Sequence, residues 1–118
     1  MSFHDQLLLA IDGWSSDPIQ DEWLFEKFRD QFVEKMSCCE AFEAIGKTID
    51  VLLIQADEST AIEVLQTLIA LARQSNTTEI PPTLFSQKDA LFGQFSAFGD
   101  YANDKLRELF RIYRLSYS

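Results

Sequence analysis

The sequence predicts an all-α fold of about six helices, arranged either as stacked antiparallel hairpins of the HEAT type or as a compact orthogonal bundle. Apolar residues recur at three- and four-residue steps through most of the chain, which is the spacing of one face of an α-helix. No segment alternates apolar and polar residues over the length of a convincing strand. Hydrophobic residues make up 47% of the 118 residues, so we expect one folded helical domain over 1–118, with a core that requires no cofactor, metal or disulfide.

The stretch over 37–72 is predicted to form the central pair of helices, which are joined by a short acidic turn. Each helix carries a start signal. Ser37 with Glu40, and Thr60 with Glu63, fit the capping box, in which each side chain bonds the backbone N–H of the other residue. The expected apolar faces are Cys38, Phe42, Ile45, Ile49, Leu52, Leu53 and Ala56 in the first helix, widened by Val51 and Ile54, and Ala61, Val64, Leu65, Leu68, Ile69 and Ala72 in the second.

Two helices are expected before the central pair. Ser2 is predicted to cap the first, and Gly13 to end it in a left-handed conformation. Asp17 is predicted to cap the second, with Pro18 at the first helical position, where its missing N–H costs nothing. The expected inner faces are Phe3, Leu7, Leu8, Ile11 and Trp14 in the first helix, and Trp23 or Leu24, Phe25, Phe28, Phe32 and Met36 in the second.

Two helices are also expected after the central pair. Pro81 and Pro82 block helix formation, so 76–82 is predicted to be a loop, and the next helix is expected over about 83–98. Gly99 and Asp100 then begin a last helix that extends to about residue 115. The inward-facing residues are expected to be Leu84, Leu91, Phe92, Phe95 and Phe98, followed by Ala102, Leu106, Leu109, Phe110 and Tyr113.

The charge is distributed unevenly along the chain. The 19 acidic and 10 basic residues give a net charge of −9, and residues 1–63 hold 14 acids against 4 bases, a balance of −10. Residues 64–118 hold 5 acids against 6 bases, a balance of +1. This distribution argues against direct binding to nucleic acid or to an anionic membrane, because both need a basic patch. It favours a basic protein as the partner.

The second predicted helix carries a row of four acids at four-residue steps, and we call it the acidic ridge: Glu22, Glu26, Asp30 and Glu34. Like charges at this spacing repel each other, and Lys27 and Arg29 are expected to offset part of the repulsion. The ridge is either a solvated face or a surface for a cationic partner. The candidate partner-binding residues are the ridge together with Asp57 and Glu58, and Glu40, Glu43 and Asp50 are expected to extend the same field.

The last helix contains the basic part of the chain: Lys105, Arg107, Arg111 and Arg114. Acidic residues interleave with these bases, so the helix is a weak candidate for binding nucleic acid. We expect the bases to complement the helix dipole and to pair with the acidic half of the chain.

No catalytic constellation is visible, so we expect no enzymatic activity. The chain has one histidine, His4, and a Ser-His-Asp or Cys-His arrangement would have to use it. Glu40 and Glu43 form Glu-x-x-Glu, but no Glu-x-x-His accompanies them, which argues against a di-iron site. The adjacent Cys38 and Cys39 cannot form a disulfide within a helix. This cysteine usage and the lack of a signal-peptide pattern at the amino terminus predict a cytoplasmic protein.

Residues 68–84 carry a family resemblance. A helix that ends in Arg-Gln-Ser-Asn-Thr-Thr-Glu-Ile-Pro, at 73–81, resembles small helical immunity proteins of bacterial toxin–immunity systems, including contact-dependent growth inhibition. The resemblance covers the 17 residues 68–84 and is interpreted as structural, with Thr77 or Thr78 and Glu79 organising the turn before Pro81. Interfaces differ from member to member of these families, so the resemblance assigns no functional residue.

The resemblance implies one-to-one binding of a cognate toxin in the cytosol of the producing cell. Many such toxins are nucleases with a basic cleft, which a carboxylate ridge would occupy in place of the nucleic-acid backbone. Two other classes remain open. A nucleic-acid mimic that inhibits a host enzyme would carry carboxylates around most of its surface. A HEAT-like adaptor subunit would expose an apolar patch of several hundred Å².

Overall fold

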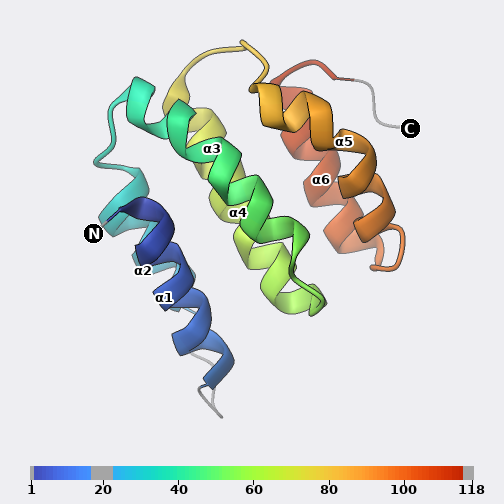
Figure 1. Cartoon of the computed structure of the whole chain (residues 1–118), viewed down its shortest axis with the longest axis horizontal. Coiled ribbons are helices and arrows are strands. Elements are labelled where there is room, and N and C mark those ends of the chain that lie inside the picture. Colours follow the sequence, from blue (N-terminus) through green and yellow to red (C-terminus); the bar gives the residue numbers. More distant parts are fainter. Residues whose placement is uncertain (1, 17–22, 116–118) are drawn as a thin grey trace.

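The computed structural model describes residues 2–16 and 23–115, and within them the chain forms six α-helices and no strand (Figure 1). The prediction of an all-α fold with about six helices is therefore confirmed. The helices are α1 (Phe3–Ser16), α2 (Leu24–Phe28), α3 (Cys38–Leu53), α4 (Glu58–Ser75), α5 (Pro82–Phe95) and α6 (Asp100–Ile112), and the π-helical segment η1 (Arg29–Val33) continues α2.

The helices lie in two layers, as Figure 1 shows: α1, α3 and α5 form the front layer, and α2, α4 and α6 form the rear layer. In the first two pairs α1 packs on α2 and α3 packs on α4, and in the third the ring of Phe92 in α5 lies 5.1 Å from that of Phe110 in α6. Neighbouring pairs contact each other through α1 and α3, α3 and α5, η1 and α4, and α4 and α6. The resulting slab measures 38 × 34 × 18 Å. Of the two arrangements that the sequence left open, this layering is that of stacked antiparallel hairpins.

The central helix of the rear layer, α4, is the most deeply buried element. Its predicted apolar face is confirmed, because all six residues of that face are buried. The side chains of Thr60, Thr67, Leu71 and Ser75 are buried with them. The apolar face of α6 was also predicted correctly, with Ala102, Leu106, Leu109, Phe110 and Tyr113 all buried.

The start of α3 was predicted correctly. The Oγ atom of Ser37 accepts a hydrogen bond from the N–H of Glu40 at 3.1 Å, and Oε1 of Glu40 accepts one from the N–H of Ser37 at 3.0 Å. The hydrogen bond from the Ser37 backbone, followed by that with its side chain, lowers the pKa of Glu40 below its ordinary value. The capping box therefore favours the ionised carboxylate at the positive end of the helix dipole.

The start of α4 was predicted three residues too late, because Asp57 and not Thr60 caps this helix. One carboxylate oxygen of Asp57 accepts hydrogen bonds from both the N–H and the hydroxyl of Thr60, at 3.0 and 2.9 Å. Thr60 is consequently buried in the first turn. Aspartate satisfies an orphan N–H of the helix start as well as threonine does, and it stands earlier in the chain.

Several apolar positions and one boundary differ from the prediction. Gly13 does not end α1, which continues to Ser16, and no glycine has a positive φ among the described residues. Leu8 is exposed, as are Trp23, Cys38, Ile54 and Ala56. The predicted start of the second helix at Asp17 and Pro18 lies outside the described residues.

The second helix widens into a π-helical turn that the periodicity did not predict. The N–H of Glu34 donates to the carbonyl of Arg29 at 3.2 Å, a bond that spans five residues and not four. The wider turn lets Val33 enter the core at 1% exposure while Phe32 stays partly buried beside Phe28. The acidic ridge is therefore not the straight row that a continuous α-helix would produce.

The third hairpin packs against α3 at a glycine. A Cβ atom at Gly46 would lie 3.1 Å from Oγ1 of Thr83 in α5, which is closer than ordinary van der Waals contact. The absence of a side chain at this position therefore lets α3 and α5 approach closely. Leu84, Leu91 and Phe95 anchor α5 in the core as predicted, although α5 begins at Pro82 and ends three residues earlier than expected.

Substituting the serine of the capping box tests its contribution to stability. Ser37→Ala removes the acceptor for the N–H of Glu40 and should lower the free energy of unfolding by about 1 kcal/mol. Ser59→Ala is the matched control, because Ser59 is an exposed serine in the first turn of α4 that does not cap it. Urea denaturation monitored by circular dichroism measures both, and equal effects of the two substitutions would contradict the assigned cap.

Candidate functional site

The acidic ridge lies on the rear layer, on the helix formed by α2 and η1. Glu26, Asp30 and Glu34 are all exposed, and Glu22 lies outside the described residues. The buried residues of the same helix are Phe25, Phe28 and Val33. These apolar side chains fix the orientation of the helix, because turning it outward would expose two phenylalanines to water.

Arg29 does not offset the ridge as the sequence suggested. Its guanidinium points to α4, where Nη1 lies 3.5 Å from Oε2 of Glu63. The two side chains are only 18% and 22% exposed, so this pair joins η1 to α4 at the boundary of the core. Among the described residues, no cation pairs with the carboxylates of Glu26, Asp30 or Glu34.

The lysines of the second helix lie beside the acids. Lys27 is exposed and follows Glu26 directly, so it projects about 100° further around the helix. Lys35 lines a hollow together with Ser2 and Gln6 at the start of α1, which shows that its flank of the helix faces α1. The lysine flank and the flank with Arg29 therefore point to different neighbours, and the acids lie between them.

An exposed tryptophan stands at the beginning of the ridge. Trp23 is 54% exposed, and its carbonyl accepts a hydrogen bond from the N–H of Lys27 at 2.9 Å, so it is in register with the helix. Its spacing to Glu26 and Asp30 is three and seven residues, which puts all three on one helix face. Tryptophan is one of the residues enriched in the binding hot spots of protein interfaces. Sequence periodicity missed this feature because it assigned Trp23 or Leu24 to the core.

The other two candidate residues, Asp57 and Glu58, have structural partners. Asp57 caps α4 through Thr60, and Oε2 of Glu58 accepts a hydrogen bond at 3.2 Å from the N–H of Gly99. The Glu58 bond joins the start of α4 to the turn between α5 and α6. Both carboxylates therefore stabilise the fold at positions separate from the second helix.

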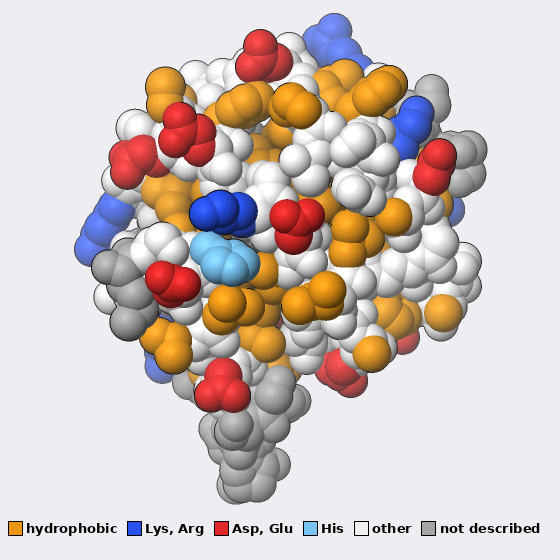
Figure 2. Space-filling view, in the orientation of Figure 1, with side chains coloured by type: hydrophobic (Ala, Val, Ile, Leu, Met, Phe, Trp, Pro, Cys, Tyr) orange, Lys and Arg blue, Asp and Glu red, His pale blue; other side chains and the backbone are white. Residues whose placement is uncertain are grey.

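The acids of α3 do not extend the ridge, because α3 belongs to the front layer. Glu43 and Asp50 are exposed there, whereas Glu40 is engaged in the capping box. Figure 2 shows that acidic side chains on the front face are mostly separated by apolar and uncharged atoms. The predicted acid field is therefore divided between two layers.

The basic last helix pairs differently from the prediction. Nη1 of Arg107 lies 2.6 Å from a carboxylate oxygen of Asp104, and Nζ of Lys105 lies 3.4 Å from Oε2 of Glu108, both within α6. The other oxygen of Glu108 accepts a hydrogen bond from Arg73 of α4. No ion pair joins α6 to the acidic residues of the first half among the described residues. The carboxylates of Glu26, Asp30 and Glu34 are therefore not neutralised by the bases of α6.

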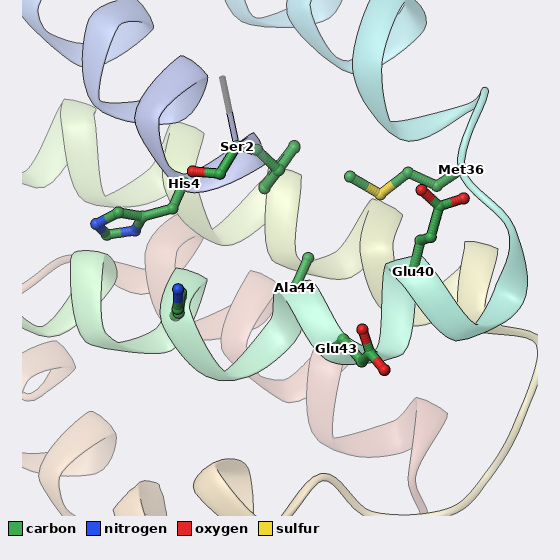
Figure 3. Close-up of a pocket in the computed structure, with 8 residues that line it drawn as sticks. Ser2, His4, Met36, Glu40, Glu43 and Ala44 are labelled. Carbon is green, nitrogen blue, oxygen red and sulfur yellow. The ribbon is translucent and has the colours of Figure 1, made fainter.

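A hollow of about 340 Å³ lies between the start of α1 and the outer face of α3. In Figure 3, Met36 and Glu40 lie at one end of it and His4 at the other, with its imidazole directed away from them. Nδ1 of His4 is buried without a hydrogen-bond partner among the described residues, and no group of three metal-ligating side chains was found there. No converging set of groups for catalysis is formed in this hollow.

The pH dependence of stability tests the link between α4 and α6. Burial raises the pKa of Glu108, but the hydrogen bonds and charges of Arg73 and Lys105 outweigh it, so the pKa lies below the ordinary value of 4.5. A carboxylate with a lowered pKa stabilises the fold at neutral pH and loses this contribution as pH falls through the folded-state pKa. Glu108→Gln should therefore reduce the loss of stability between about pH 5 and pH 3, by less than about 1 kcal/mol because the pair is partly exposed.

Urea denaturation at a series of pH values measures this effect. Asp89→Asn is the control, since Asp89 is an exposed carboxylate of α5 and has no ion-pair partner among the described residues. If Glu108→Gln and Asp89→Asn leave the same pH dependence, the contact between Arg73 and Glu108 does not contribute to stability.

No described helix has the length and apolarity needed to cross a membrane. The chain matches no protein-family model, no curated protein and no solved structure.

Proposed function

We propose that this chain is an immunity protein that binds a cognate basic toxin one-to-one through its acidic ridge and neutralises it. The observation that carries the proposal is the state of the ridge: Glu26, Asp30 and Glu34 are exposed on one helix, and none pairs with a cation among the described residues. Each pair of like charges four residues apart on a helix face destabilises the helix by about 0.2–0.5 kcal/mol. A cationic partner would turn this cost into attraction.

Two further features support the binding of a basic protein at the acidic ridge. Trp23 supplies a large side chain on the same face, and aromatic residues contribute a large share of binding energy at protein interfaces. The balance of −10 over residues 1–63 would speed the encounter with a basic protein, since opposed fields steer association. Asp57 and Glu58 are secondary candidates because their carboxylates already cap and join helices.

A nuclease domain is the toxin that fits this chemistry best. A nuclease binds the phosphate backbone through lysine and arginine side chains in a cleft, and exposed carboxylates are the protein groups that can replace those phosphates. The resemblance of residues 68–84 to immunity proteins supports the same class of toxin, because many toxins of these systems are nucleases. We therefore propose that the ridge covers the basic cleft of the toxin.

The two alternatives fit the surface less well. A nucleic-acid mimic would need carboxylates around most of the molecule, but Arg107, Arg111 and Arg114 are exposed on and after α6. An adaptor subunit would need one large apolar patch. The exposed apolar side chains are instead spread over several elements: Leu8, Leu9, Trp23, Ile54, Phe85 and Tyr101.

Charge reversal on the ridge tests the proposal. Glu26→Lys combined with Asp30→Lys should weaken binding of the toxin by several kcal/mol if both carboxylates are buried against cations. It should not lower the stability of the free protein, because it relieves repulsion between exposed like charges. Binding to the protein encoded by the adjacent open reading frame, measured by surface plasmon resonance at low and high salt, and protection of growth against that protein are the readouts.

The matched control is Asp50→Lys combined with Asp89→Lys. These residues are exposed on α3 and α5 of the front layer, so the control changes the net charge equally without touching the ridge. It should slow association slightly and leave dissociation unchanged. The proposed interface fails if the ridge variant protects cells fully and binds with unaltered affinity and salt dependence.

A further inference from the structure

A small crevice lies on the rear layer, where η1 and α6 flank α4. Its volume is about 210 Å³, and its lining includes Arg29 of η1, Arg73 of α4 and Lys105 of α6. Each of the three helical hairpins thus contributes one cation. Gln66, Ile69 and Ala70 of α4 also line the crevice, and the small side chain of Ala70 takes up little of its space.

The crevice holds more hydrogen-bond donors than acceptors. Arginine and lysine side chains only donate, and two carboxylates face the three cations. Glu108 accepts from both Arg73 and Lys105, so its two oxygens are engaged. Glu63 lies beside Arg29 at 3.5 Å, which is an ion-pair separation longer than a hydrogen bond.

The strongest indication that the crevice lacks a hydrogen-bond acceptor is the guanidinium of Arg29. Its Nη1 atom is inaccessible to solvent and makes no hydrogen bond with any described residue. This atom is the one that lies 3.5 Å from Oε2 of Glu63. A buried charged donor without a hydrogen bond is costly even beside an opposite charge, so it is uncommon in a folded protein. Here the donor belongs to a side chain that lines the crevice.

We propose that this crevice is a binding site for a single oxyanion, a phosphate or a carboxylate group, which Arg29, Arg73 and Lys105 hold together. Guanidinium groups bind both oxyanions in a two-pronged geometry. The volume is below that of pockets for drug-sized ligands, so one small group fits and a nucleotide does not. The site is separate from the acidic ridge and does not depend on the toxin partner.

Nuclear magnetic resonance of the arginine side chains tests the site. Inorganic phosphate and, separately, acetate are titrated into the protein at constant ionic strength, with sodium chloride as the reference. We expect saturable shifts of the Arg29 and Arg73 Nε–H signals, and we expect these shifts to be larger for phosphate because it carries more charge.

Two variants of the crevice test the assignment. Arg73→Gln should weaken the apparent affinity about tenfold, which corresponds to the loss of one charge-assisted contact. Arg73 is largely exposed, so the variant is expected to fold, and Lys105→Gln provides a second test.

Arg107→Gln is the matched control. Arg107 lies on the same helix as Lys105 and pairs with the exposed Asp104, outside the crevice lining, so its loss changes the net charge equally. Saturable shifts that persist in Arg107→Gln and weaken in Arg73→Gln and Lys105→Gln support the site. A response to phosphate alone identifies a phosphate site, whereas equal responses identify a general oxyanion site. Shifts that match those of sodium chloride, or an equal loss in the control, overturn it.

Discussion

The burial of α4 is the constraint on which the rest of the structure depends. This helix contacts α3 across the layers and both η1 and α6 within its own layer, so it touches all three hairpins, as α3 does in the front layer. Leu65, Leu68 and Leu71 are completely buried on it, and each contributes about 1.5–3 kcal/mol by leaving water. Polar contacts from its last turns then fix the neighbours: Arg73 reaches Glu108 of α6, and the amide of Gln74 donates to the carbonyls of Glu34 and Met36.

These contacts indicate that the Arg-Gln-Ser segment at 73–75 stabilises the fold. Arg73 and Gln74 tie the third and first hairpins to the second, and the hydroxyl of Ser75 donates to the carbonyl of Ala72 inside the core. Thr77 accepts from the N–H of Glu79 in the turn that follows. The expectation that the threonine and Glu79 organise this turn is confirmed for Thr77. Because each residue of the motif serves the fold, the same sequence is compatible with different binding surfaces elsewhere on the molecule.

The sequence was sufficient where a signal is local and failed where the decisive contact is distant in the chain. Ser37 and Glu40 were recognised because the capping box is contained in four residues. Asp57 and Thr60 are both good helix caps, and the choice between them depends on the burial of Thr60 in the core. Arg29 was expected to offset the acidic ridge of its own helix, but its partner Glu63 comes from another helix. The π-helical turn could not be predicted, because one widened turn shifts the apolar spacing no more than an ordinary irregularity in the sequence does.

The acidic ridge and the oxyanion crevice differ in how far the sequence predicts them. The acidic ridge was visible in advance because its residues are four apart on one helix, although the exposure of Trp23 beside it was not. The crevice could not be predicted, since Arg29, Arg73 and Lys105 stand far apart in the sequence. Their common location follows from the stacking of the hairpins. The basic last helix gave a partial signal, but among the described residues Arg107 and Lys105 pair with the nearer Asp104 and Glu108 and not with the acidic half.

The side-by-side order of the hairpins also has a consequence for the speed of folding. Helices that pack on each other are consecutive in the chain or separated by one helix, so the loops that must close to bring them together are short. Closing a short loop costs less chain entropy than closing a long one, and proteins dominated by such local contacts fold in microseconds to milliseconds. The hairpin of α3 and α4 can collapse first, and the outer hairpins can then add to it independently, one on each side.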